Sequence, residues 1–234
     1  TRDGKLYTPT GEGEVVLDSG TYEAFTLPEY ASGMINSDYK SYFIEVEKGI
    51  KVHVLETGRG FPVFLMHGNP TSGFLYRKIV EFMPLDMVRV IMPTSIGLGF
   101  SSKVPASEHT LENHIRWISI VLKELELTEL VYAGQDWGGP IGMGALSLFP
   151  ELLKGAVLMN TGFNAPTIDT DISPAHAIVK TPIVGELILE VFFSIFDRLG
   201  RVQGDSETWT SEIATLYGKP CLLYTSDAAD ECDS

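Results

Sequence analysis

Short apolar runs alternate with helical patterns through the middle of the chain, and this alternation limits the possible folds more than any other feature. Each run is apolar on consecutive positions, as expected for a strand covered on both faces of a parallel sheet. The runs are Val63–Met66, Val88–Met92, Leu130–Ala133 and Ala156–Met159. Helical patterns fall between these runs at 73–83 and at 138–149, and a third begins after Thr110, which is the expected N-cap. Together they predict an α/β fold, a three-layer α/β/α sandwich with right-handed crossovers.

Two alternating segments come before this region. Tyr42–Glu47 and Ile50–Glu56 alternate apolar and polar residues, and Lys48-Gly49 between them supplies a turn, which predicts an antiparallel hairpin. Residues 1–41 show no sustained period and are expected to form an irregular N-terminal extension. The core is therefore expected to span 42–164.

The alternation stops after Asn164. Apolar residues recur at helical spacing between 173 and 199, which predicts an inserted helical cap over 165–219. Residues 220–234 show no clear period and hold four acidic and no basic residues. Their sequence resembles one reading frame of a common sequencing adapter, so we expect a non-native tail; a natural acidic C-terminus is the alternative.

Composition excludes several classes of protein. The 234 residues are 44% hydrophobic and 21% charged, which excludes disorder, collagen and a disulfide scaffold. The net charge of −14 comes without the clustered basic residues that nucleic acid requires. The apolar stretch 183–196 is shorter than a bilayer of about 30 Å needs. We expect a cytoplasmic protein with no nucleic-acid or membrane partner, although a chain that starts at Thr1 without Met leaves a leader open.

The segment Gly134–Gly139 carries the strongest chemical signal. Glycines two residues before and two after Asp136 permit the strained strand-to-helix turn that lifts a nucleophile above a sheet. A lone Asp at a helix start is often only an N-cap, but the two glycines favour a nucleophile. Attack by a carboxylate on an acyl carbon gives a reactive anhydride, whereas attack on an sp³ carbon gives a stable alkyl ester. Asp136 therefore predicts an alkyl electrophile, with a carbon–halogen bond or an epoxide.

Two neutral hydrogen-bond donors are expected beside Asp136. Asn69 follows the strand Val63–Met66, and Trp137 follows Asp136 directly. The Asn amide and the Trp indole N–H can each donate to a leaving halide, whose charge develops only in the transition state. Asn before Pro is usually a turn residue and Trp is usually a core residue. Their joint placement favours halide binding.

These motifs resemble those of the haloalkane dehalogenases, a family with the α/β-hydrolase fold. The family's successive loops match His67–Ser72, Gly97–Ser101 and Gly134–Gly139. By this resemblance Asp136 is the nucleophile, Asn69 and Trp137 bind halide, and the Trp137 N–H with Asn69 forms the oxyanion hole. The resemblance implies hydrolytic dehalogenation through an aspartyl-alkyl ester, with a small halogenated alkane, water and halide as partners and no metal or organic cofactor.

The chain also departs from the family pattern. One branch carries its catalytic acid as Glu at the position of Asn160, so the acid is expected after a later strand. The family's base is a His after the final strand, and no such segment lies between the predicted cap and Ser234. Both groups are expected beyond Pro220, which makes the chain as given inactive for turnover. Ordinary surface or core positions are expected for His53, His67, His109, His114 and His176.

Two other functions stay open. An epoxide hydrolase also uses an Asp nucleophile but needs tyrosines to protonate the oxirane oxygen, and Tyr217 is the only tyrosine between Asn164 and the tail. A non-catalytic, hydrolase-like ligand-binding protein is the other alternative.

Overall fold

A computed structural model describes residues 4–162 and 206–222 of the chain. Two compact units divide the sequence, and the second spans residues 164–222. The predicted helices between 173 and 199 lie outside the described residues, as does the tail from residue 223.

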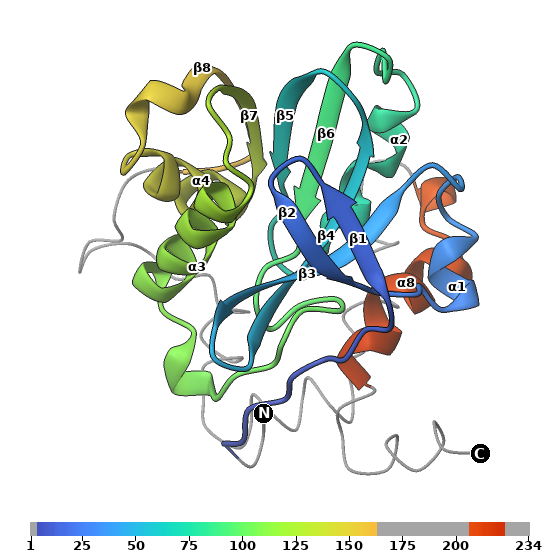
Figure 1. The fold of residues 1–234 in the computed structure, drawn as a ribbon. Helices are drawn as coiled ribbons and strands as arrows, with labels where there is room; N and C mark the ends of the chain where they lie inside the picture. Colours follow the sequence, from blue (N-terminus) through green and yellow to red (C-terminus); the bar gives the residue numbers. More distant parts are fainter. Residues whose placement is uncertain (1–3, 163–205, 223–234) are drawn as a thin grey trace. The chain divides into compact units, whose positions relative to one another are not determined.

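One eight-stranded mixed sheet forms the first unit, in the order β1-β2-β3-β4-β6-β5-β7-β8 (Figure 1). Neighbours from β1 to β4 are antiparallel, and β4 also meets β6 antiparallel. Strands β6, β5, β7 and β8 run parallel, as the apolar runs predicted. The strands are Glu14–Leu17 (β1), Gly20–Ala24 (β2), Lys40–Glu47 (β3), Ile50–Gly58 (β4), Phe61–Met66 (β5), Val88–Pro93 (β6), Leu130–Gln135 (β7) and Leu153–Met159 (β8).

Helices form in each of the three predicted connections. Thr110 is the N-cap of α3, as predicted, because its hydroxyl accepts the Asn113 N–H at 3.1 Å. The helices of the first unit are Glu29–Ser32 (α1), Gly73–Tyr76 (η1), Arg77–Val80 (α2), Ala106–Glu108 (η2), Leu111–Glu124 (α3), Gly138–Leu146 (α4) and Pro150–Leu152 (η3). The second unit contributes Ser206–Thr208 (η5) and Ser211–Leu222 (α8). None of these described helices is long and apolar enough to cross a bilayer.

The strand order fixes where a ligand can bind. Strand β6 lies on one side of β5 in the sheet, and β7 lies on the other side. The connection from β5 to β6 and the connection from β6 to β7 therefore run in opposite directions across the sheet. Because parallel crossovers are right-handed, these two steps place α2 and α3 on opposite faces of the sheet. The step from β7 to β8 continues in the second direction, and α4 accordingly packs beside α3 (Figure 1). A crevice therefore opens where β5 and β7 end, which is the usual ligand site of such sheets.

The N-terminal extension is more regular than predicted. Within residues 1–41, β1 and β2 form a hairpin in which Glu14 pairs with Glu23 and Leu17 with Gly20, and β2 then pairs with β3. The expectation of an irregular segment is wrong there, because neither Glu14–Leu17 nor Gly20–Ala24 alternates apolar and polar residues.

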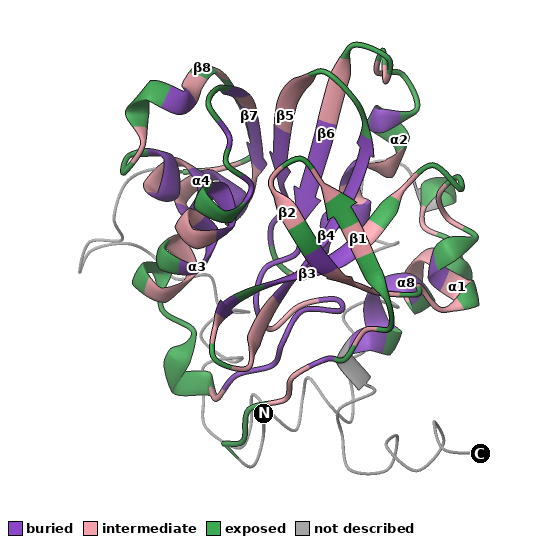
Figure 2. Ribbon diagram, viewed as in Figure 1, coloured by how far each residue is buried: buried purple, intermediate pink, exposed green. Residues whose placement is uncertain are grey.

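Strand β8 lies at the edge of the sheet in the described part of the chain. The sequence predicted a strand covered on both faces, but 53% of Val157 and 39% of Leu158 is exposed. Buried residues gather instead on the middle strands β4, β5 and β6 (Figure 2). That prediction is wrong for the described residues. An apolar run predicts that both faces of a strand are buried, but the helices or strands that bury them are distant in the sequence and are not predicted by the run itself.

A buried ion pair ties β3, β4 and β6 together. Arg89 donates to both carboxylate oxygens of Glu56, from Nε at 2.8 Å and from Nη2 at 2.9 Å. The Tyr42 hydroxyl donates to the same carboxylate at 2.8 Å. Only 3% of the Glu56 side chain and 17% of the Arg89 side chain is exposed. Removal of either partner leaves a buried charge without its counter-ion.

Arg89→Met is therefore expected to lower the free energy of unfolding by about 3–5 kcal/mol, because Glu56 loses its buried partner. Urea denaturation measures this loss. Arg59 is exposed and provides the matched control, for which Arg59→Met should change stability by no more than about 0.5 kcal/mol. Equal effects of the two substitutions would contradict a structural role for the ion pair.

Candidate active site

Asp136 occupies a strained turn between β7 and α4. Its φ of +53° lies in the left-handed region, which costs a non-glycine residue about 1–3 kcal/mol and persists only where its surroundings enforce it. The end of β8 does so: the Asp136 N–H donates to the Met159 carbonyl at 3.3 Å, and the Thr161 hydroxyl donates to the Asp136 carbonyl at 2.6 Å. Gly139 allows this approach, since a Cβ there would lie 2.0 Å from the Thr161 hydroxyl oxygen. The sharp turn predicted from the glycine spacing is present.

Two further glycines let the end of β5 approach the turn. A Cβ on Gly68 would lie 2.3 Å from the Cβ of Asp136, and a Cβ on Gly138 would lie 2.1 Å from the Met66 carbonyl oxygen. Real Cβ atoms do not pack this closely, so any larger residue would push the loops apart. Glycine is therefore required on both sides of Asp136.

Tyr132, on β7, stabilises the turn through a hydrogen bond to the start of α4. Its buried hydroxyl donates to the Gly138 carbonyl, and burial raises the pKa of Tyr132, so the hydroxyl keeps its proton. A Cβ on Gly142 would lie 2.0 Å from the same hydroxyl. Sequence reasoning missed both Tyr132 and Thr161. The four-residue spacing of Gly138 and Gly142 was the available sign that a side chain lies against this face of α4.

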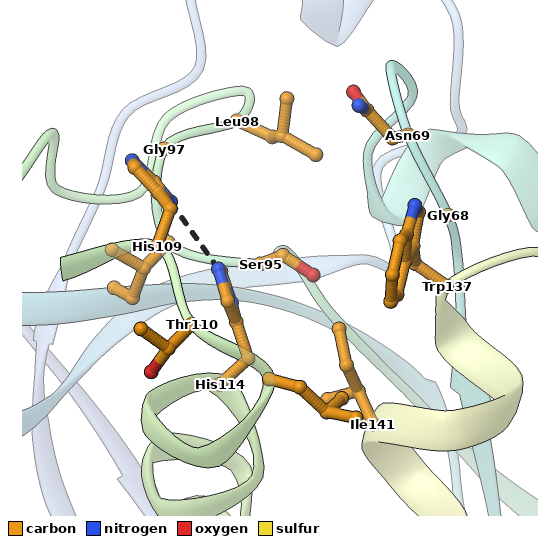
Figure 3. Close-up of a pocket in the computed structure, with 12 residues that line it drawn as sticks. Gly68, Asn69, Ser95, Gly97, Leu98, His109, Thr110, His114, Trp137 and Ile141 are labelled. Atoms are coloured by element: carbon orange, nitrogen blue, oxygen red, sulfur yellow. Dashed lines mark hydrogen bonds between the residues drawn. The ribbon is translucent and has the colours of Figure 1, made fainter. Parts of the chain in front are cut away.

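The predicted site residues lie together. The Asn69 N–H donates to Oδ1 of Asp136 at 2.9 Å, so the loop after β5 holds one oxygen of the carboxylate. Asn69 and Trp137 line one cavity of about 470 Å³, and Figure 3 shows the nitrogen end of the Trp137 indole on the side of Asn69. Trp137 is 52% exposed, so its indole N–H is within reach of a ligand. The other lining residues are Gly68, Ser95, Ile96, Gly97, Leu98, His109, Thr110, Leu111, His114 and Ile141.

His67 braces the loop that carries Asn69. The Ser95 N–H donates to Nε2 of His67 at 3.0 Å, so Nε2 carries no proton. Nδ1 therefore carries the proton and donates to the Gly68 carbonyl at 2.8 Å. Burial lowers the pKa of His67 to about 4, which keeps the ring neutral at pH 7. The ring links the ends of β5 and β6 and agrees with the structural position expected from the sequence.

His109 and His114 form the opposite wall of the cavity (Figure 3). Nδ1 of His109 lies 3.2 Å from Nε2 of His114, and the two rings stack. Burial lowers the pKa of His109, and burial together with His109 lowers the pKa of His114 to about 4. This differs from the ordinary placement expected for both residues. Two imidazoles do not complete a metal site, and no three His, Cys, Asp or Glu side chains converge as metal ligands in residues 4–162 or 206–222.

Comparison with known proteins agrees with this geometry. The alpha/beta hydrolase fold family model matches residues 62–225. A cis-3-alkyl-4-alkyloxetan-2-one decarboxylase from Shewanella oneidensis is 36% identical over 159 residues, which covers 66% of this chain and 49% of the relative. Haloalkane dehalogenase 2 of Mycobacterium tuberculosis is 34% identical over 125 residues, which covers 53% of this chain and 43% of the relative. The chain thus spans about half the length of the curated relatives it matches.

A solved structure extends the comparison to three dimensions. The haloalkane dehalogenase DatA from Agrobacterium tumefaciens C58 superposes with a TM-score of 0.60 at 27% identity, over 73% of this chain and 57% of DatA. The resemblance to haloalkane dehalogenases predicted from the motifs is confirmed.

The neutral state of His67 predicts a dependence of stability on pH. The folded pKa of about 4 lies below the ordinary value of 6.5, so the unfolded chain binds the proton first as the pH falls. The contribution of His67 to stability is complete above pH 6.5 and is lost as the pH falls toward 4. His67→Gln should reduce the slope of unfolding free energy against pH in this window by about 1 kcal/mol per pH unit. Urea denaturation at a series of pH values measures the slope, and an unchanged slope would contradict the neutral ring.

Proposed function

The chain belongs to the α/β-hydrolase fold family, and from this we propose that it carries the alkyl-transfer half of a haloalkane dehalogenase, with Asp136 as the nucleophile. One observation carries the proposal: the backbone of Asp136 is left-handed, and the Asn69 N–H holds Oδ1 of its carboxylate. This carboxylate lies beside a cavity lined by Asn69 and Trp137. Haloalkane dehalogenases among the relatives support the same chemistry.

The bond from Asn69 gives the two carboxylate oxygens different tasks. Oδ1 is occupied by the Asn69 N–H, so Oδ2 is assigned as the attacking atom. Oδ2 forms a bond to the sp³ carbon of the substrate while the carbon–halogen bond breaks, and the halogen leaves with the bonding electron pair. The product is an alkyl ester of Asp136 and a free halide ion.

Neutral donors stabilise the halide as it leaves. The Asn69 side-chain amide and the Trp137 indole N–H border the same cavity, and no Asp or Glu is among the described residues that line it. Their dipoles act on charge that develops in the transition state, which is where binding accelerates a reaction. The lowered pKa values of His109 and His114 keep the opposite wall neutral at pH 7.

Opening of the ester requires a base for water. Once Oδ2 carries the alkyl group, Oδ1 is the ester carbonyl oxygen, and the Asn69 N–H is placed to stabilise the oxyanion formed by water attack. Among the described histidines, His67 uses both ring nitrogens for its neighbours, and His109 and His114 bond to each other. His53 is fully buried on β4. We therefore expect none of the described histidines to activate water, so that the reaction supported by residues 4–162 and 206–222 stops at the alkyl ester.

A second candidate substrate is a strained lactone. One relative is named as a decarboxylase of 3,4-dialkyl oxetan-2-ones, and it matches 66% of this chain. The ring carbon bonded to oxygen in such a lactone is also an sp³ electrophile, and its leaving group is a carboxylate. Attack by Asp136 would again give an alkyl ester, with a free carboxylate on the bound group in place of a released halide.

An epoxide fits the cavity less well. Ring opening of an epoxide produces an alkoxide, which is basic and needs a proton from a nearby acid. No tyrosine or carboxylic acid lines the cavity within the described residues. A halide and a carboxylate need no proton when they leave, so the haloalkane and the lactone are favoured.

Incubation of the chain with 1-bromobutane is expected to add one butyl group at Asp136 and to release one bromide per chain. Intact-mass spectrometry and peptide mapping locate the adduct, and parallel samples with an alkyl epoxide and a dialkyl oxetan-2-one compare the three electrophiles. Asp136→Asn keeps the size of the side chain but lacks the attacking charge, so it should gain no adduct.

Each outcome of that experiment decides between the candidate functions. A butyl adduct with stoichiometric bromide supports the proposal, and an adduct only from the oxetan-2-one favours the lactone. Bromide release over many turnovers would overturn the assignment of the described histidines. Absence of every adduct favours the non-catalytic ligand-binding protein.

Gly68→Ala should slow alkylation of Asp136 by about 10²-fold, because a displacement of about 1 Å at a reacting group has that effect. The added Cβ would lie 2.3 Å from the Asp136 Cβ. Gly162→Ala is the matched control, since a Cβ at Gly162 meets nothing within 4 Å. The rate of mass gain with 1-bromobutane measures both variants, and equal rates would show that the contact at Gly68 does not place the nucleophile.

A further inference from the structure

The ammonium group of Lys103 is enclosed by main-chain carbonyls. Nζ donates to the carbonyls of Leu98 at 3.2 Å, Gly99 at 2.6 Å and Ser101 at 2.8 Å. Lys103 is only 7% exposed. A buried ammonium is costly unless hydrogen bonds replace its water, and these carbonyls provide three such bonds.

The loop around this ammonium has two backbone bonds of its own, from the Gly97 N–H to the Ser102 carbonyl at 2.8 Å and from the Ser101 N–H to the Leu98 carbonyl at 3.1 Å, and Lys103 adds three more bonds to its carbonyls. Gly97 and Gly99 take φ values of +91° and +44°, and this path turns the carbonyls of Leu98, Gly99 and Ser101 toward one point. Three carbonyl dipoles that converge repel one another unless a donor or cation lies between them. Nζ of Lys103 supplies both the charge and the protons.

The position of Lys103 itself is fixed from outside the loop. Its N–H donates to the Tyr7 carbonyl at 3.0 Å, and the Tyr7 N–H donates to the Lys103 carbonyl at 2.8 Å. The neighbouring Ser102 N–H donates to the Lys51 carbonyl at 2.9 Å. The ammonium therefore connects a firmly paired backbone segment to the glycine-containing loop.

The same loop supplies part of the cavity wall. Leu98 lines the cavity, and in Figure 3 its side chain extends toward the side on which Asn69 lies. The Leu98 N–H donates to the Ser95 carbonyl at 3.1 Å, and Ser95 holds the ring of His67. The carbonyl of Leu98 is thus bonded to Lys103, and its N–H is bonded to Ser95, which contacts the His67 ring.

We propose that Lys103 is a positioning residue for substrate selection: its ammonium holds the 97–101 loop closed, so that Leu98 narrows the cavity opposite Asn69 and Trp137. The inference rests on the proposed function for the identity of the substrate. A narrow cavity accepts a linear primary bromoalkane and rejects one that is branched beside the reacting carbon. The loop opens when the ammonium is lost, and the branched substrate then enters.

The test compares Lys103→Met, which keeps an unbranched apolar side chain and removes the charged, hydrogen-bonding end, with Leu98→Ala, which widens the same wall directly. Lys48, exposed in the turn between β3 and β4, gives the matched control Lys48→Met. For each protein the rates of adduct formation with 1-bromobutane and with 1-bromo-2-methylpropane are measured, and their ratio is taken. The ratio is independent of the fraction of folded protein.

Lys103→Met should shift this ratio toward the branched substrate by about tenfold, as expected for loss of a hydrogen bond to a charged group. Leu98→Ala should shift it in the same direction, and the double variant should shift it no further than the larger single effect. Lys48→Met should leave the ratio unchanged. An unchanged ratio in Lys103→Met, with both rates reduced equally, would overturn the proposal and leave Lys103 a purely structural residue.

Hydrogen exchange separates this inference from the proposed function. Peptides that cover residues 97–101 should exchange about tenfold faster in Lys103→Met than in the unaltered chain, while peptides from β5 and β7 keep their protection. If the unaltered chain gains no adduct, the proposed function fails, and the exchange result still decides whether the ammonium holds the loop. Equal exchange rates over residues 97–101 in Lys103→Met and in the unaltered chain would overturn the role of Lys103.

Discussion

The close packing of three backbone segments around Asp136 is the constraint on which the rest of the site depends. The ends of β5, β7 and β8 meet at contacts that only glycine permits, at Gly68, Gly138 and Gly139. This packing enforces a left-handed backbone at Asp136, which an aspartate would otherwise avoid. Hydrogen bonds to the backbone from the hydroxyls of Tyr132 and Thr161 stabilise this strained turn, so the carboxylate proposed as the nucleophile is held by groups outside the proposed chemistry.

The local parts of this arrangement could be predicted from the sequence, and the long-range parts could not. The glycine spacing around Asp136 and the apolar runs identify the turn and the parallel strands, because both depend on residues adjacent in the chain. The bond from Ser95 to His67 joins positions 28 residues apart, and the bond from Thr161 to Asp136 joins positions 25 apart. The hydrophobic periodicity of a sequence does not indicate contacts between residues so far apart in the chain. The β1–β2 hairpin was missed for a different reason, since neither of its strands alternates apolar and polar residues.

Neutrality of the cavity is as important as its donors. A positively charged wall would attract the halide ion after it has left the carbon and would oppose its release from the cavity. Burial lowers the pKa of His109, and burial together with His109 lowers the pKa of His114, so this wall is neutral at pH 7. In the proposed reaction, the donors of Asn69 and Trp137 act on the charge that develops as the halide leaves the carbon. The same argument holds for a carboxylate leaving group, which is why the cavity alone does not separate a haloalkane from a strained lactone.

The two walls of the cavity have separate mechanical supports. Asn69 and Trp137 lie on loops fixed by the turn at Asp136, whereas Leu98 lies on a loop fixed by the ammonium of Lys103. A change at Lys103 can therefore alter the width of the cavity without moving the carboxylate or its Asn69 donor. Under the two proposals, reactivity would depend on glycine contacts that leave no room for an added atom, and selectivity would depend on a loop to which Lys103 donates three hydrogen bonds. Such a division allows the substrate range to change while the attacking group stays in place.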